Sequence, residues 1–228
     1  MEPILRPGRH GLVAMVRASS GDDGEHELAR ALAALHPREQ QLALTLAPLR
    51  KAEWILGRTA LRQALRGQDL ACDLPLLRDD RGAPSVPTTA AASLSHKGRW
   101  AAALAAPRQA ARSIGVDLEH AAPSRYDISA RVLTDRELRQ LESLDERARG
   151  LAVTLRFSAK EAVYKAIDPW LRRYVGFREV EVELDAQGEG RAHAVDPRLA
   201  SELAGCTLEL TWAQVEEHWL CTALVERR

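Results

Sequence analysis

Residues 156–167 read Arg-Phe-Ser-Ala-Lys-Glu-Ala-Val-Tyr-Lys-Ala-Ile, and this stretch predicts a helix with one polar edge. Ser158 precedes Glu161 by three residues, which is the spacing of a capping box at a helix start. We expect the helix to stop at the Asp-Pro pair 168–169, because proline cannot continue the backbone hydrogen bonds. Glu161 and Lys165 then lie one above the other, four residues apart. They form either an exposed ion pair, worth about 0.2–0.5 kcal/mol, or part of a reactive site.

The composition indicates a soluble globular protein. Its 228 residues suit one large domain or two small ones. The chain carries 32 basic and 32 acidic residues, so no net charge favours nucleic acid or an acidic membrane surface. We find no signal peptide and no apolar run near the roughly 20 residues of a membrane span. The three cysteines lack an even count and metal-ligand spacing, which favours a reducing cytoplasm over a disulfide framework or zinc site.

Two polar stretches in the first half are candidates for binding an anion. Residues 49–65 predict a helix whose basic side chains lie largely off its apolar face, either as a solvated surface or as a phosphate-binding one. Residues 93–96, Ser-Leu-Ser-His, precede an apolar run at 101–106 that is a strand or a helix. His96 is either an ordinary hydrogen-bonded residue or part of the anion site.

Residues 113–120, Ser-Ile-Gly-Val-Asp-Leu-Glu-His, predict a strand. Alternation places Asp117 and Glu119 on one face, about 7 Å apart. Such a pair belongs either to an exposed edge or to a hard cation, because magnesium binds carboxylate oxygens, waters and substrate phosphates.

Further patterns place helices before the central stretch and strands after it. Helices are expected at 129–141, where Thr134 and Glu137 have capping-box spacing, and at 144–157; strands are expected at 11–18, 174–184, 207–215 and 218–225. This order favours an antiparallel sheet with helices laid on it, an α+β arrangement.

Four stretches taken in series resemble the motifs of 4'-phosphopantetheinyl transferases of the surfactin- and enterobactin-synthetase type. They are Gly-Arg-Thr-Ala-Leu-Arg at 57–62, Ser-Leu-Ser-His at 93–96, Ile-Gly-Val-Asp-Leu-Glu at 114–119 and Phe-Ser-Ala-Lys-Glu-Ala-Val-Tyr-Lys at 157–165. The resemblance implies an α+β fold of two pseudo-symmetric halves, each a small antiparallel sheet packed with helices. We expect residues 1–108 on the nucleotide side of coenzyme A and residues 109–228 on the magnesium and catalytic side, joined by a link at 107–112.

The resemblance implies transfer of the phosphopantetheine arm of coenzyme A to a serine of an apo acyl, peptidyl or aryl carrier protein. Magnesium assists, and adenosine 3',5'-bisphosphate is released. A cytoplasmic monomer serving polyketide, nonribosomal peptide or siderophore synthesis is implied. The resemblance also implies that Asp117, Glu119 and Glu161 bind the metal. It implies catalytic roles for Asp117, Lys165 and Glu161, and either Glu161 or a neighbouring water acts as the base. The implied contacts to coenzyme A are Arg50, Arg58, Ser95, His96, Lys160 and Lys165.

The chain departs from the surfactin-type pattern at one turn, and two other functions remain open. It has Ala83 where those enzymes carry lysine, so Lys97 or Arg81 is the candidate replacement. The choice between Arg50 and Lys51 for the 3'-phosphate also stays open. A metal-dependent nuclease would carry a lysine two residues after the second carboxylate, which this chain lacks. A catalytically inert carrier-binding module would be expected to have lost one of the acidic or lysine positions, and all are present.

Overall fold

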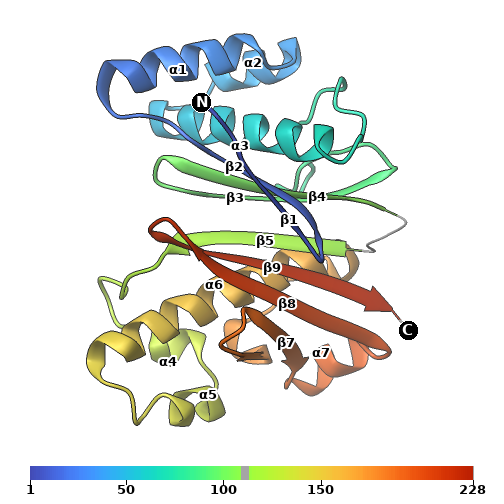
Figure 1. Cartoon of the computed structure of the whole chain (residues 1–228). Helices are drawn as coiled ribbons and strands as arrows, with labels where there is room; N and C mark the ends of the chain where they lie inside the picture. The colour runs from blue at the N-terminus through green and yellow to red at the C-terminus, as the bar shows by residue number, and fades with distance from the viewer. Residues whose placement is uncertain (109–112, 228) are drawn as a thin grey trace. The chain divides into compact units, whose positions relative to one another are not determined.

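The computed structural model describes residues 1–108 and 113–227, and the chain forms two compact units, Met1–Ala111 and Arg112–Arg228 (Figure 1). Each unit is an antiparallel sheet packed with helices, which confirms the predicted α+β class. Most of the predicted link at 107–112 lies outside the described residues. Within the described ranges, no helix combines the length and apolarity needed to cross a membrane.

The first unit is built on a four-stranded sheet with the order β1-β2-β4-β3. Its strands are β1 (Ile4–Gly8), β2 (Gly11–Arg17), β3 (Ala90–Lys97) and β4 (Trp100–Pro107). The apolar run at 101–106 is therefore a strand, and β1 is a strand that the sequence patterns did not reveal. Alanines fill the buried centre of β4, and their small side chains allow a helix to pack closely on the sheet.

Helix α3 (Pro48–Arg66) is that helix, and α1 (Gly21–Ala33) and α2 (Pro37–Leu44) pack against it (Figure 1). The core joins apolar residues of α3 to alanines of β2 and β4. Gly57 lies against Leu94 of β3, where an added Cβ would approach Leu94 Cδ1 to 3.1 Å. The two predicted anion-binding stretches thus pack against each other.

The second unit has a five-stranded sheet with the order β5-β9-β8-β7-β6. Its strands are β5 (Ser113–His120), β6 (Val180–Leu184), β7 (Glu189–Ala194), β8 (Cys206–Val215) and β9 (His218–Arg227). The strands predicted at 113–120, 207–215 and 218–225 are confirmed. The strand predicted from residue 174 begins later, after the 3-10 turn η1 (Phe177–Glu179), and β7 was not predicted.

Short helices accompany this sheet. They are α4 (Ser129–Val132), α5 (Asp135–Gln140) and α7 (Pro197–Glu202). The helix predicted over 129–141 is therefore two helices. The capping box at the start of α5 is confirmed, since Thr134 Oγ1 accepts from Glu137 N and the Glu137 carboxylate accepts from Thr134 N.

The central helix α6 (Glu146–Leu171) is longer than predicted, with 26 residues. It begins after Asp145, whose side chain accepts from Ala148 N, and it ends where Arg172 adopts a left-handed conformation. The predicted start at Ser158 is wrong because the Ser158 hydroxyl has a tertiary partner and caps nothing. The predicted stop at Pro169 is also wrong, since the helix continues through this proline to Leu171, although proline has no N–H to donate to the carbonyl of Lys165.

Helix α6 lies directly on β5. An added Cβ at Gly115 would overlap the Ala162 carbonyl oxygen, so only glycine permits this approach. Ser113 Oγ also donates to Ala166 O at 2.5 Å. The helix and the strand that carry the predicted catalytic residues are therefore in backbone contact.

Candidate active site

Asp117 of β5 is buried between two residues of α6. Lys165 Nζ donates to Asp117 Oδ1 at 2.7 Å, and Ser158 Oγ donates to Oδ2 at 2.9 Å. Lys165 also donates to the Val116 carbonyl at 3.0 Å. Both oxygens of the carboxylate have partners, so its orientation is fixed. Sequence reasoning missed Ser158 in this role, although seven residues separate it from Lys165 and two helical turns place both on one face.

Glu161 lies between Ser158 and Lys165 along α6. Burial raises its pKa, the Asp117 carboxylate raises it further, Lys165 opposes this, and Glu119 adds a smaller rise. The structure thus brings Asp117, Glu119 and Glu161 into one electrostatic cluster. Lys165 belongs to it through Asp117, so the exposed pair with Glu161 is not the main contact of this lysine.

The carboxylates of Asp117, Glu119 and Glu161 have the charge and the oxygen atoms that a hard cation prefers. Glu161, whose ionisation the charges of Asp117 and Glu119 oppose, would gain from a nearby positive ion, and magnesium prefers carboxylate oxygens. Across residues 1–108 and 113–227, no group of three or more His, Cys, Asp or Glu side chains is preassembled as a metal centre. Cys72, Cys206 and Cys221 are free thiols, as expected.

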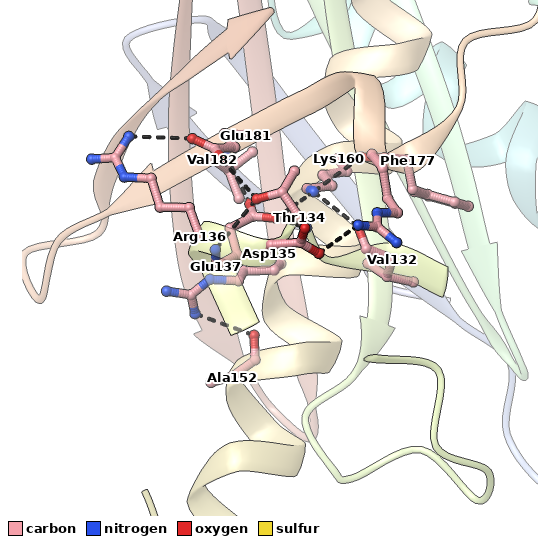
Figure 2. A network of polar contacts seen from close by, with 12 residues as sticks. Val132, Thr134, Asp135, Arg136, Glu137, Ala152, Lys160, Phe177, Glu181 and Val182 are labelled. Atoms are coloured by element: carbon pink, nitrogen blue, oxygen red, sulfur yellow. Dashed lines mark hydrogen bonds and ion pairs between the residues drawn. The ribbon is translucent and has the colours of Figure 1, made fainter. Parts of the chain in front are cut away.

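Lys160 does not lie where a phosphate could reach it, contrary to the expectation for this residue. Its side chain is fully buried, and its ammonium donates to three acceptors within the second unit (Figure 2). These are Glu137 Oε2 at 2.6 Å, Val132 O at 2.9 Å and Phe177 O at 3.0 Å. An ammonium has three protons, so this side chain has no donor left for coenzyme A. The pattern misled because Lys160 and Lys165 lie on different faces of α6.

In the first unit, Glu53 connects two predicted coenzyme A residues. Arg50 Nη1 donates to Glu53 Oε2 at 2.8 Å, and His96 Nδ1 lies 3.6 Å from Glu53 Oε1. Arg50 and His96 are both exposed. The start of α3 and the end of β3 therefore present a cation and an imidazole together. Sequence reasoning did not include Glu53, although it lies one helical turn after Arg50.

Arg58 is buried, unlike Arg50. Its guanidinium carbon lies 3.8 Å from the centre of the Trp54 ring, and Nη2 donates to Leu77 O at 3.2 Å. Its pKa is lowered to about 10, mainly by burial and further by Arg78 and Arg62, against the opposing charge of Glu39. Arg58 Nε is buried without a hydrogen-bond partner among the described residues.

The remaining predicted nucleotide residues are less closely grouped. Ser95 and His96 are consecutive on β3, so their side chains point to opposite faces of the sheet, and Ser95 is buried while His96 is exposed. Ala83 lies in a turn held by Asp79, whose carboxylate accepts from the backbone N–H of Arg81 and of Ala83, each at 2.9 Å.

Comparison with known proteins identifies the family. The model of the 4'-phosphopantetheinyl transferase superfamily matches residues 113–223, and that of the 4'-phosphopantetheinyl transferase N-terminal domain matches residues 38–106. The 4'-phosphopantetheinyl transferase PptT of Mycobacterium tuberculosis is 29% identical over 200 residues, which cover 83% of this chain and 85% of that one.

Two further relatives agree. The 4'-phosphopantetheinyl transferase Npt of Nocardia iowensis is 31% identical over 170 residues, covering 74% of each chain. Enterobactin synthase component D of Salmonella austin is 31% identical over 165 residues, covering 72% of this chain and 67% of its own. With two family models matching in series and these relatives aligned over most of their length, the chain belongs to the 4'-phosphopantetheinyl transferase superfamily and is an enzyme of that class.

Proposed function

We propose that this enzyme transfers the 4'-phosphopantetheine arm of coenzyme A to a serine hydroxyl of an apo carrier protein. The serine oxygen attacks the phosphorus that bears the pantetheine, and the bond to adenosine 3',5'-bisphosphate breaks. The observation that supports this most is the placement of Asp117 between Lys165 and Ser158, beside Glu161 and Glu119. Asp117, Glu119, Glu161 and Lys165 are the residues that the family resemblance assigns to the reaction, and Ser158 is added by the structure.

Asp117, Glu119 and Glu161 are the proposed magnesium ligands. The electrostatics of Glu161 support this, because the charges of Asp117 and Glu119 both raise its pKa. When bound, magnesium would neutralise the diphosphate and polarise the attacked phosphorus.

Glu161, or a water beside it, takes the proton of the serine hydroxyl. Glu161 is only partly buried, so a hydroxyl can approach it. Lys165 is the proposed cation for the phosphates and stabilises the charge that develops on the leaving group. Its side chain is 28% exposed and can serve this role, unlike the fully buried side chain of Lys160.

The nucleotide end of coenzyme A is assigned to the first unit. Arg50 and His96 are exposed side by side around Glu53, and Arg58 offers a buried donor without a partner among the described residues. These observations support binding of the 3'-phosphate by Arg50 and Arg58 and of the nucleotide by His96. Ser95 stays in the proposed set on the family resemblance alone.

The partners proposed are apo acyl, peptidyl and aryl carrier proteins, and a monomer working in the cytoplasm is the proposed form. The similarity to enterobactin synthase component D supports a carrier of nonribosomal peptide or siderophore synthesis among the substrates.

The decisive experiment is incubation with coenzyme A, magnesium and each type of apo carrier, followed by mass spectrometry of the carrier. A mass gain of one phosphopantetheine arm, with loss of that gain on chelation of magnesium, is the expected result. Binding of the carrier without any gain in mass would instead identify an inert carrier-binding module.

A further inference from the structure

A polar cluster lies on the side of α6 that faces α5. We name it the Lys160 cluster: the buried residues Thr134, Glu137, Lys160 and Glu181, with the exposed Arg136 at its edge. Glu137 is its centre and is 1% exposed. Glu137 Oε2 accepts from Lys160 Nζ at 2.6 Å and from Thr134 N at 2.9 Å, while Oε1 accepts from Val182 N at 2.9 Å (Figure 2). One carboxylate therefore joins α5, α6 and β6.

The cluster continues outward from this centre. Thr134 Oγ1 donates to Glu181 Oε1 at 2.6 Å, and Arg136 Nη1 donates to Glu181 Oε2 at 3.2 Å. Each buried charge is thus paired and hydrogen-bonded, which is the condition under which a buried ion pair is tolerated. Removing Lys160 alone would leave the buried Glu137 without its closest counter-charge.

Lys160 also holds the segment that follows α6. Its hydrogen bond to Phe177 O fixes η1. The Phe177 ring packs on α6, and its centroid lies 5.1 Å from the ring centroid of Tyr164 and 5.3 Å from that of Phe157. Tyr164 lies one turn beyond Glu161. The face of α6 next to the proposed base is therefore covered by a segment that Lys160 anchors.

Contacts with β5 hold the opposite side of the helix, through the bonds of Ser158 to Asp117 and of Ser113 to Ala166. A rotation of α6 about its axis would break the contacts on both sides. Glu161 directly follows Lys160, and successive helical residues are about 100° apart, so the anchoring of Lys160 sets the direction of Glu161.

We propose that Lys160 is a positioning residue, which acts through Glu137 to fix the orientation of Glu161 and makes no contact with coenzyme A. This inference rests on the proposed transfer reaction. It assigns two different tasks to the two lysines of one motif: Lys165 meets the phosphates, and Lys160 holds the helix that presents the base.

The experiment compares steady-state kinetics and melting temperatures of wild type, Lys160→Met, Glu137→Gln and the double variant. Each single change should lower kcat about tenfold while KM for coenzyme A stays within about twofold, because ground-state binding is untouched. Lys160→Met should also lower the melting temperature by about 10 °C. The double variant, which removes both charges, should recover kcat to within about threefold of wild type.

Lys165→Met is the matched control, since it makes the same substitution on the same helix. Its loss of turnover should not be recovered by adding Glu137→Gln, because a lost phosphate contact cannot be replaced at Glu137. A rise in KM for coenzyme A in Lys160→Met, or a double variant as slow as that single variant, would overturn the positioning role. If Lys160→Met does not fold, the double variant decides alone; failure of both to fold would make Lys160 a stability residue only and overturn the proposal.

The two proposals fail in different ways. If wild-type protein transfers no arm to any carrier, the proposed function is wrong. If wild type is active but Lys160→Met raises KM for coenzyme A, or the double variant is as slow as Lys160→Met, only the inference about Lys160 is wrong.

Discussion

Lys165 Nζ lies 2.7 Å from Asp117 Oδ1, and this contact joins α6 to β5 at the centre of the proposed site. The lysine is the partly exposed member of the pair, and Asp117 is 4% exposed. Magnesium at Asp117, if bound there as proposed, would supply a positive charge to the same carboxylate that Lys165 contacts.

Asp117→Asn should abolish magnesium-dependent transfer, with a loss of at least about 10³-fold, because an amide brings no charge to a hard cation. Carrier mass and turnover at several magnesium concentrations measure this. Excess magnesium or manganese should restore Glu119→Gln better than Asp117→Asn, since Glu119 is the more exposed ligand and can act through water. Wild-type turnover of Asp117→Asn in ordinary magnesium would contradict the proposed metal site.

Ser158→Ala should lower kcat about tenfold, because Asp117 Oδ2 loses the donor that orients it, and should cost about 1–3 kcal/mol of unfolding free energy. Ser113→Ala is the matched control. Its buried hydroxyl bonds the Ala166 carbonyl and not a proposed catalytic residue, so it should cost similar stability without the loss of kcat. Equal kcat in the two variants, measured at saturating coenzyme A, would show that Ser158 is only structural.

His96→Ala should raise KM for coenzyme A about tenfold and leave kcat within about twofold, the pattern of lost ground-state binding. The reason is its place beside Arg50 and Glu53, in a unit that carries none of the proposed metal ligands. His193→Ala is the control, because His193 is half exposed on β7 and lies near Glu183. A collapse of kcat at saturating coenzyme A would instead assign His96 to proton transfer.

His10 should make the protein less stable in weak acid. Its pKa is lowered from 6.5 to about 4, first by burial and then by the charge of Arg9. Between these pH values the unfolded chain binds the proton more readily, so the contribution is present above pH 6.5 and is lost as the pH falls toward 4. The full loss amounts to about 3 kcal/mol.

Denaturant titrations of wild type and His10→Gln from pH 7 to pH 4 test this prediction. The difference in unfolding free energy between the two proteins should change by that amount across the range, because glutamine does not titrate. A constant difference would show that His10 is protonated equally in the folded and unfolded states.

Much of the fold followed from local pattern. Alternation of apolar and polar residues revealed β5 and β8, because successive side chains of a strand point to opposite faces, and an apolar run that starts at Trp219 revealed β9. The capping box of α5 was also visible, since both of its bonds join residues three apart. The family resemblance supplied Asp117, Glu161 and Lys165, and the structure gathers their side chains.

Tertiary structure decided the length of α6 and the burial and hydrogen-bond partners of its polar residues. Ser158 has capping-box spacing, yet its partner is Asp117, 41 residues earlier in the chain. Lys160 and Lys165 look alike in the sequence, but Lys160 finds acceptors 28, 23 and 17 residues away and becomes buried. The sequence by itself determined which residue types the reaction needs and which segments are strands. Which of the two lysines is buried and which stays partly exposed depended on distant partners, because a polar side chain is buried only where remote segments supply its hydrogen bonds and counter-charge.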